Sequence, residues 1–269
     1  MRTKLIAGSV VAIAASILGL AAACSTGTEP ASTPAPAYGP SVNFAQGTAR
    51  AFIQTDAAGI PTSLGIAMTE GALSGLPTTV TGPSPTALMV TLPLPSTTVA
   101  TGFDHAELGW NPNGHEPQGL YALPHFDLHF YMVSTATQMA ILPSDPQFGA
   151  KASNLPAAPF VPVGYVPPPA PVAASAIPQM GVHWTDTKSP ELTGKGFSNT
   201  FIYGSWDGKF IFLEPMITKA YLETHPNSTQ EVPQPAQWAS AGYYPSSYAV
   251  AYDAAAKEYR FTLSALVKH

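Results

Sequence analysis

The sequence predicts an all-β fold, a β-sandwich or a barrel-like arrangement, with a few short helices and a long proline-rich loop. Three observations predict it: 29 prolines in 269 residues, a charged fraction of only 10%, and short aromatic or β-branched runs bounded by turn residues. Proline removes a backbone donor and so disfavours long helices. The strand-like runs do not alternate with helical patterns, which argues against an α/β organisation.

The first 23 residues have the order of an export signal. Arg2 and Lys4 precede an apolar run that ends in small residues. The run leads into LAAAC, which resembles a bacterial lipobox, although Ala21 replaces the usual leucine. The sequence therefore predicts a lipoprotein signal peptide over residues 1–23 and lipidation of Cys24. A plain signal peptide cleaved nearby and a retained membrane helix are the alternatives.

Residues 24–40 are small, polar and rich in proline. Such a segment buries too little apolar surface to offset its ordering entropy, so we expect a flexible, lipid-anchored linker. A single mainly-β domain is expected over residues 41–269. Cys24 is the only cysteine, so no intrachain disulfide is expected.

The anchor predicts an exported protein that is attached to the membrane at the cell envelope. Ser25, rather than aspartate, follows the lipidated cysteine, which by analogy favours the outer membrane if the source has two membranes. The net charge is −5 and the 11 basic residues are scattered, so no nucleic-acid partner is expected. A small-molecule ligand and a homo-oligomer are left open.

Turn residues divide the expected domain into strand candidates. The clearest hairpin is TFIYGSWDGKFIFLEP, whose two aromatic runs meet at an Asp-Gly dipeptide. A two-residue turn there pairs Phe201 with Glu214. It also pairs Tyr203 with Phe212. Further strands are expected over NFAQGTARAFIQTD, ALMVTLPLP and SYAVAYDAAAKEYRFTLSALV, short helices over TATQMAIL and ITKAYLET, and an ordered loop over residues 142–180.

The stretch PHFDLHFYM reads as a strand with two chemically different faces, because side chains two residues apart share a face. The polar face holds His125, Asp127, His129 and Tyr131, and the apolar face, expected in the core, holds Phe126, Leu128, Phe130 and Met132. Along a straight strand the two histidines lie roughly 13 Å apart. They can share one ion only if the strand bends.

Imidazoles and carboxylates on neighbouring segments favour a divalent-metal site. The predicted metal ligands are His115, His125, His129, His183 and Glu214. The residues predicted to orient these ligands are Asp127, Glu116 and Asp186. Nitrogen and oxygen donors suit Zn²⁺, Fe²⁺ or Mn²⁺, and an open coordination position would bind water. The other histidines, His105, His225 and His269, are expected at the surface.

Three functional hypotheses stay open. The first is an exported lipoprotein with a His/carboxylate metal site whose reaction is not identified. The second is a non-catalytic envelope binding or structural protein whose histidine cluster is metal-free. The third is a cupin-like metal-dependent oxygenase or isomerase. GxSxG, HExxH, GxGxxG and P-loop motifs are absent from the sequence, so no nucleotide cofactor is expected and no catalytic residue can be named.

Three segments, GHEPQGLYALPHFDLHFYMV, MGVHWTD and TFIYGSWDGKFIFLEPMIT, are similar to an uncharacterised bacterial family classed as a domain of unknown function. Members of this family are exported or lipid-anchored. The pattern G-H-E-P-x-G-x-Y-x-x-P-H-F-D-x-H-F-Y-M carries the resemblance, which covers roughly residues 41–222. The resemblance implies a mainly-β domain and implies no activity.

Overall fold

Two antiparallel sheets form a β-sandwich, which confirms the predicted all-β class. The computed structural model describes residue 1 and residues 34–82, 84–97, 100–117 and 119–269. The strands of the first sheet are β1 (Ala37–Tyr38), β2 (Val42–Phe44), β3 (Gly47–Thr55), β4 (Pro61–Thr69), β12 (Asn227–Glu231), β13 (Tyr243–Asp253) and β14 (Glu258–Lys268). Their order is β1-β3-β4-β14-β13-β12, with β2 also paired to β3.

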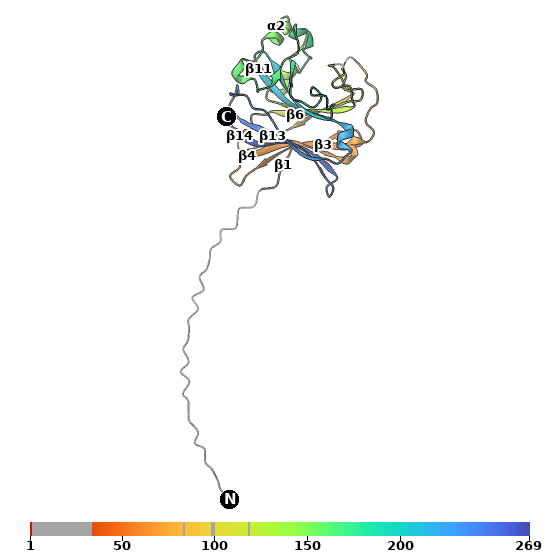
Figure 1. The fold of residues 1–269 in the computed structure, drawn as a ribbon, viewed down its shortest axis with the longest axis vertical. Helices are drawn as coiled ribbons and strands as arrows, with labels where there is room; N and C mark the ends of the chain where they lie inside the picture. Colours follow the sequence, from red (N-terminus) through yellow and green to blue (C-terminus); the bar gives the residue numbers. More distant parts are fainter. Residues whose placement is uncertain (2–33, 83, 98–99, 118) are drawn as a thin grey trace, which may run out of the picture. The chain divides into compact units, whose positions relative to one another are not determined.

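The second sheet carries the histidine-rich part of the chain. Its strands are β5 (Leu88–Pro93), β6 (His105–Asn111), β7 (His125–Tyr131), β8 (Tyr165–Val166), β9 (Val182–Asp186), β10 (Asn199–Trp206) and β11 (Lys209–Thr218). Their order is β5-β6-β7-β11-β10-β9-β8, so β7 and β11 lie side by side at the middle of the sheet. Figure 1 shows the first sheet below and the second sheet above it.

The helices are short. They are α1 (Thr135–Met139), α2 (Phe148–Ser153) and α3 (Lys219–Leu222), with 3-10 turns at Glu70–Leu73, Ala158–Phe160 and Val172–Ser175. The helices predicted at TATQMAIL and ITKAYLET are thus confirmed as α1 and α3. No helix in the described residues is long and apolar enough to span a membrane.

Two of the sequence predictions concern the N-terminal region. The predicted signal peptide and Cys24 lie outside the described residues. At the end of the segment expected as a linker, β1 is paired with β3, with Ala37 opposite Ile53. The last residues before position 41 therefore extend the first sheet.

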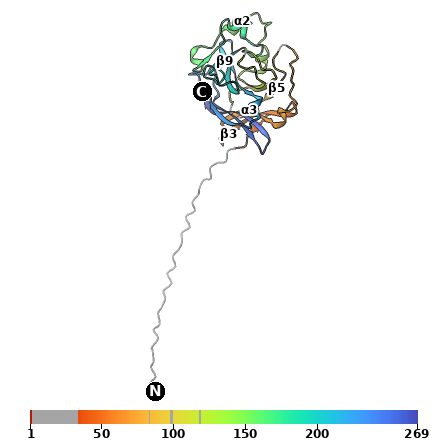
Figure 2. The same cartoon turned by 45° about the vertical axis from the view of Figure 1, so that its right-hand side comes forward.

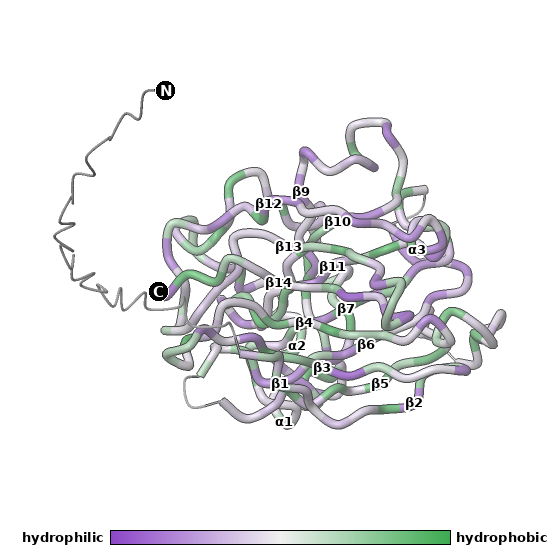
Figure 3. The backbone as a smooth tube through the Cα atoms, turned by 90° about the horizontal axis from the view of Figure 1, so that it is seen from below, coloured by the Kyte–Doolittle hydropathy of each residue, from purple (hydrophilic) through white to green (hydrophobic). Residues whose placement is uncertain are grey.

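The main core lies between the two sheets. Phe44 from the first sheet contacts Phe126 from the second, with ring centroids 6.2 Å apart, and Phe201 contacts Tyr248 at 4.9 Å. Figure 3 shows hydrophobic and hydrophilic residues interspersed along the strands, as expected for strands that bury one face in this core.

A β-bulge in the β10–β11 hairpin changes the predicted register. The Asp-Gly turn forms as expected, with positive φ at Asp207 and Gly208. The register then shifts between Gly204 and Ser205, so Glu214 pairs with Ile202 instead of the predicted Phe201. The bulge places one extra residue on β11.

The bulge also separates two aromatic residues that were expected on one face. Tyr203 pairs with Leu213, not with Phe212. Phe210 packs toward the main core, where its ring contacts Tyr203 at 5.2 Å. Phe212 packs in a separate apolar cluster with Tyr131. Phe212 therefore lies on the side of the sheet that carries the histidines.

The second sheet is covered on its outer face, the face turned away from the main core. Every residue of β6 and of β7 is buried. One small apolar cluster there contains Tyr121 and Phe197, and another contains Ile141 and Phe212. The segment around α2, at the top in Figures 1 and 2, lies against the β10–β11 turn, where the N–H groups of Asp207 and Gly208 donate to the carbonyls of Lys151 and Asn154. The long loop predicted over residues 142–180 contains α2 and is ordered.

Candidate metal centre

The two faces of β7 are arranged as the sequence predicts. The side chains of Phe126, Leu128 and Phe130 lie in the main core, and Met132 packs against it. The alternate positions, His125, Asp127 and His129, are on the outer face and are buried. The strand does not bring the two histidines to a common site. Each instead belongs to a separate triad of two imidazoles and one carboxylate.

The first triad consists of His115, His125 and Asp127. Nε2 of His125 lies 3.1 Å from Oδ1 of Asp127, and Nε2 of His115 lies 3.5 Å from Oδ2. His115 comes from the loop after β6, where its backbone forms a bridge with Tyr121. As the sequence predicted for this loop, His115 lies near the start of β7, with its ring centroid 4.7 Å from that of His125.

Backbone carbonyls fix the orientation of both imidazoles in the first triad. Nδ1 of His115 lies 2.6 Å from the carbonyl oxygen of Glu116, and Nδ1 of His125 lies 2.6 Å from that of Leu123. A carbonyl oxygen only accepts hydrogen bonds, so both Nδ1 atoms carry the proton. In the neutral rings Nε2 then presents a lone pair to Asp127. This is how metal-binding histidines are commonly oriented.

Asn111, at the end of β6, holds the carboxylate of this triad. It lies opposite His125 in the sheet, and its amide donates to Oδ2 of Asp127 at 2.6 Å. The hydroxyl of Thr86 in turn donates to Oδ1 of the Asn111 side chain at 2.9 Å. Asp127, expected only to orient a ligand, is thus itself among the candidate ligands. Asn111 has the orienting contact.

The second triad consists of His129, His183 and Glu214. Oε2 of Glu214 lies 3.4 Å from Nε2 of His129 and 3.7 Å from Nε2 of His183. The three residues come from β7, β9 and β11, so the triad joins three strands. Neither ring nitrogen of His129 forms a hydrogen bond, and neither does Oε2 of Glu214. Burial of polar atoms without partners costs stability, so these atoms are expected to bind a further partner.

Aromatic rings pack against imidazoles of both triads. Phe197 contacts His125 at a centroid distance of 5.1 Å. Phe212 contacts His129 at 4.9 Å and His183 at 5.3 Å. Phe212 can do so because its cross-strand partner is Gly204: a Cβ there would lie 1.9 Å from the Phe212 ring. The glycine therefore makes room for the ring that packs against the second triad.

The spacing of the donor atoms matches that of ligands around one ion. Bonds of about 2.0–2.2 Å at a tetrahedral angle put two ligand atoms about 3.3–3.6 Å apart. The nitrogen-to-oxygen distances in the two triads are 3.1, 3.5, 3.4 and 3.7 Å. Most of these distances are too long for strong hydrogen bonds. Both triads thus have the donor types and the spacing that a divalent metal requires.

The first triad is charged in the absence of metal. Burial by itself would raise the pKa of Asp127, but the His125 and His115 imidazoles hold it well below its usual range. Burial works to lower the pKa of His115, and its contact with Asp127 outweighs this and raises it. The Asp127 carboxylate is therefore ionised and stabilises a proton on His115.

The second triad is neutral in the absence of metal. Burial, with repulsion from Asp127, raises the pKa of Glu214 well above its usual range. Burial of most of its ring lowers the pKa of His183 to about 3, and repulsion from His129 adds to this. Burial also lowers the pKa of His129. A metal ion would therefore replace a proton on Glu214 and meet imidazoles that are already neutral.

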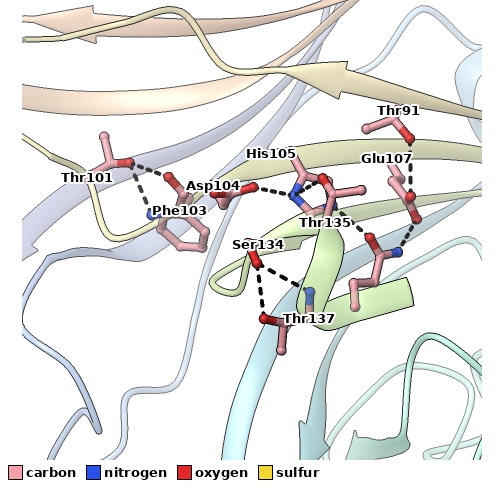
Figure 4. A network of polar contacts seen from close by, with 10 residues as sticks. Thr91, Thr101, Phe103, Asp104, His105, Glu107, Ser134, Thr135 and Thr137 are labelled. Atoms are coloured by element: carbon pink, nitrogen blue, oxygen red, sulfur yellow. Dashed lines mark hydrogen bonds and ion pairs between the residues drawn. The ribbon is translucent and has the colours of Figure 1, made fainter. Parts of the chain in front are cut away.

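A third group of polar side chains lies on the outer face and was not predicted from the sequence. His105, expected at the surface, is buried, and its ring stacks on Tyr131 at 4.9 Å. Its Nδ1 lies 2.8 Å from Asp104, and its Nε2 lies 2.9 Å from Gln138. The amide of Gln138 donates to Glu107, which lies opposite His129. Figure 4 shows this network with Thr91, which also donates to Glu107.

The other two predicted orienting residues and the two remaining histidines have different surroundings. The backbone carbonyl oxygen of Glu116 lies 2.6 Å from Nδ1 of His115. The carboxylate of Asp186 accepts from the backbone N–H of Lys188 at 2.9 Å. His225 and His269 are exposed, as expected. No sequence signal identified Asn111, because its role depends on the register between β6 and β7.

Comparison with known proteins gives one partial match. Residues 56–110 match a family described as TTHB210-like, hypothetical protein TTHB210. The matched segment covers β4 to β6 and ends before GHEPQGLY begins, so it supports a likeness to an uncharacterised family without including the histidine pattern. A search of curated proteins and a search of solved structures gave no match.

Proposed function

We propose that this protein is an exported bacterial lipoprotein whose β domain binds divalent transition-metal ions, one at each His/carboxylate triad. The observation that carries the proposal is the convergence of Nε2 atoms on carboxylate oxygens at 3.1–3.7 Å, with both ring nitrogens of His129 and Oε2 of Glu214 left without hydrogen bonds. A metal ion in the second triad would give Nε2 of His129 and Oε2 of Glu214 the partner that they lack.

The donor set favours Zn²⁺, Fe²⁺ or Mn²⁺. Each triad offers two imidazole nitrogens and one carboxylate and has no sulfur donor, a combination found in both zinc and non-haem iron sites. Three protein ligands leave at least one position open. The site therefore supports metal-dependent chemistry on a small molecule, although its reaction is not assigned.

The location of the histidines bears on the cupin-like alternative. That alternative requires imidazoles that converge inside a barrel. Here the imidazoles lie on the outer face of one sheet of a sandwich, under loops, and not between the sheets. The geometry favours a metal site on one sheet of a sandwich over a cupin-like site inside a barrel.

The proposed anchor places this domain at the cell envelope. Its support is the order of Arg2, Lys4, an apolar run and Cys24 in the sequence. Expression in a bacterial host with a clickable fatty acid tests it. The wild-type protein should carry the label, and Cys24→Ser should lose it. Equal labelling of both proteins would contradict the anchor.

Metal content tests the proposed site. The full-length protein is purified in detergent, treated with chelator, incubated with Zn²⁺, Fe²⁺ or Mn²⁺ and desalted. Elemental mass spectrometry should then find stoichiometric metal in the wild type and in the control His269→Ala. The double variant His125→Ala, His129→Ala should lose it. Absence of stoichiometric metal with all three ions would overturn the proposal.

A further inference from the structure

The two triads take neighbouring residues from the same strand. Asp127 belongs to the first triad and His129 to the second, and they are consecutive positions on the outer face of β7. Strand rise places such positions roughly 6.6 Å apart. Two bound ions would therefore be neighbours in one centre.

The distance between the triads limits which chemical groups can bind both ions at once. A single bridging oxygen fits ions about 3.5–4 Å apart. Here each carboxylate contacts the imidazoles of its own triad. Strand rise separates Asp127 of one triad from His129 of the other by roughly 6.6 Å. A group that offers one oxygen to each ion spans a longer distance. Phosphate is such a group.

The charge of the centre also favours an anion. Asp127 and Glu214 would neutralise two of the four positive charges of two divalent ions. Two further buried carboxylates lie on this face outside the triads: Glu107 accepts hydrogen bonds from Gln138 and Thr91, and Glu191 accepts one from Tyr121. Positive charge that the ligand carboxylates leave unbalanced at the ions attracts an anionic ligand.

Solvent reaches the centre at one residue of each triad. The side chain of His115 is 20% exposed and that of His183 is 24% exposed, whereas the other four candidate ligands are buried. The exposed imidazoles come from opposite sides of β7, one from the loop after β6 and one from β9. A ligand that approaches from solvent would therefore reach the first triad at His115 and the second triad at His183.

From this spacing, charge and exposure we infer that the two triads form one two-ion centre that binds a phosphate group, either inorganic phosphate or the phosphate of a larger molecule. This inference rests on the metal binding proposed above. One phosphate oxygen binds at the open coordination position of each ion. The six side chains hold the two ions at a separation that a phosphate can bridge.

Phosphate titration of the reloaded full-length protein tests the inference. Metal content and the heat of binding of inorganic phosphate are measured on the same desalted samples. The wild type should contain two ions and bind one phosphate, and the metal-free protein should bind it at least about a hundredfold more weakly. Glycerol 3-phosphate, which carries its phosphate on a larger molecule, should compete with inorganic phosphate.

Variants of each triad show whether both ions are needed. His183→Ala, at a partly exposed position, and Asp127→Asn, which preserves the side-chain shape, should each retain one ion. Each should bind phosphate at least about tenfold more weakly than the wild type. His269→Ala should match the wild type. Circular dichroism confirms that each variant is folded before it is titrated.

The possible failures are distinguishable. Two bound ions without phosphate binding, or one-ion variants that bind phosphate as tightly as the wild type, would overturn this inference and leave the proposed metal binding intact. One ion per wild-type chain would overturn the two-ion centre and would limit the proposed metal binding to one triad. No bound metal would overturn both.

Discussion

Nε2 of His129 lies 3.4 Å from Oε2 of Glu214, and neither atom forms a hydrogen bond although both residues are buried. A structural role alone would favour a shorter contact or an apolar pair at this position, since burial of an unpaired polar group costs stability. The pair is better explained as two ligands of a metal ion. Most of the expected effects of mutation follow from this relationship.

Glu214→Gln should stabilise the metal-free protein at neutral pH. Glu214 has a raised pKa, so the folded state holds its proton above the pH at which the unfolded chain releases it. Its contribution to stability is therefore present at low pH and is lost as the pH rises through the folded pKa. The glutamine cannot ionise, so the free energy of unfolding should rise by about 1–3 kcal/mol at pH 7.5.

The same variant should lose one metal ion. Urea unfolding measures the stability of the metal-free form, and elemental mass spectrometry measures the metal. Glu231→Gln, at an exposed position, is the matched control and should change neither quantity. A Glu214→Gln protein that is less stable without metal, or that retains its full metal content, would contradict the assigned role.

Metal uptake should weaken as the pH falls. The proton on Glu214 and the proton that Asp127 stabilises on His115 both compete with a metal ion. Between pH 8 and pH 6, competition with a chelator of known affinity should show a falling affinity and proton release on binding. An affinity that does not change with pH would indicate that these two residues are not ligands.

Asn111→Ala should weaken the first site selectively. Its amide holds Oδ2 of Asp127 at 2.6 Å, and loss of such a partner typically costs about 10–100-fold in metal affinity. Asn227→Ala, at an exposed position of β12, is the control. Metal titrations should show one weakened site and one unchanged site. Equal weakening of both sites would point to general loss of structure instead.

Gly204→Ala should disturb the second triad through Phe212. The added methyl group would overlap the ring, and overpacking of this kind typically costs about 1–3 kcal/mol. Metal affinity at the second site should fall with the stability. Gly149→Ala in α2 is a suitable control because no atom lies within 4 Å of the added carbon, so it should not destabilise the protein. An unchanged melting temperature for Gly204→Ala would contradict this packing role.

Local patterns in the sequence were sufficient for the fold class and for the faces of β7. Alternation separates Phe126 and Leu128 from His125 and Asp127, and the side chains pack accordingly. The strand-rise argument also holds, because His125 and His129 lie in different triads. These features depend only on residues close in the chain.

Features that depend on pairing between distant segments were not predictable in the same way. A bulge near Gly204 moved Phe212 to the histidine face and changed the partner of Glu214. His105 was expected in solvent, but the chain around α1 covers it and Gln138 contacts it. The division of the ligands into two groups follows from this long-range packing, which one sequence does not specify.

Anomalous X-ray diffraction from crystals of the Zn²⁺-loaded protein, measured on both sides of the zinc absorption edge, tests the central claim most directly. Two zinc peaks are expected. One should lie about 2.0–2.2 Å from donor atoms of His115, His125 and Asp127, and the other should lie at the same distance from those of His129, His183 and Glu214. A map with no zinc peak at either triad, with ordinary hydrogen bonds or water between these side chains, would contradict it.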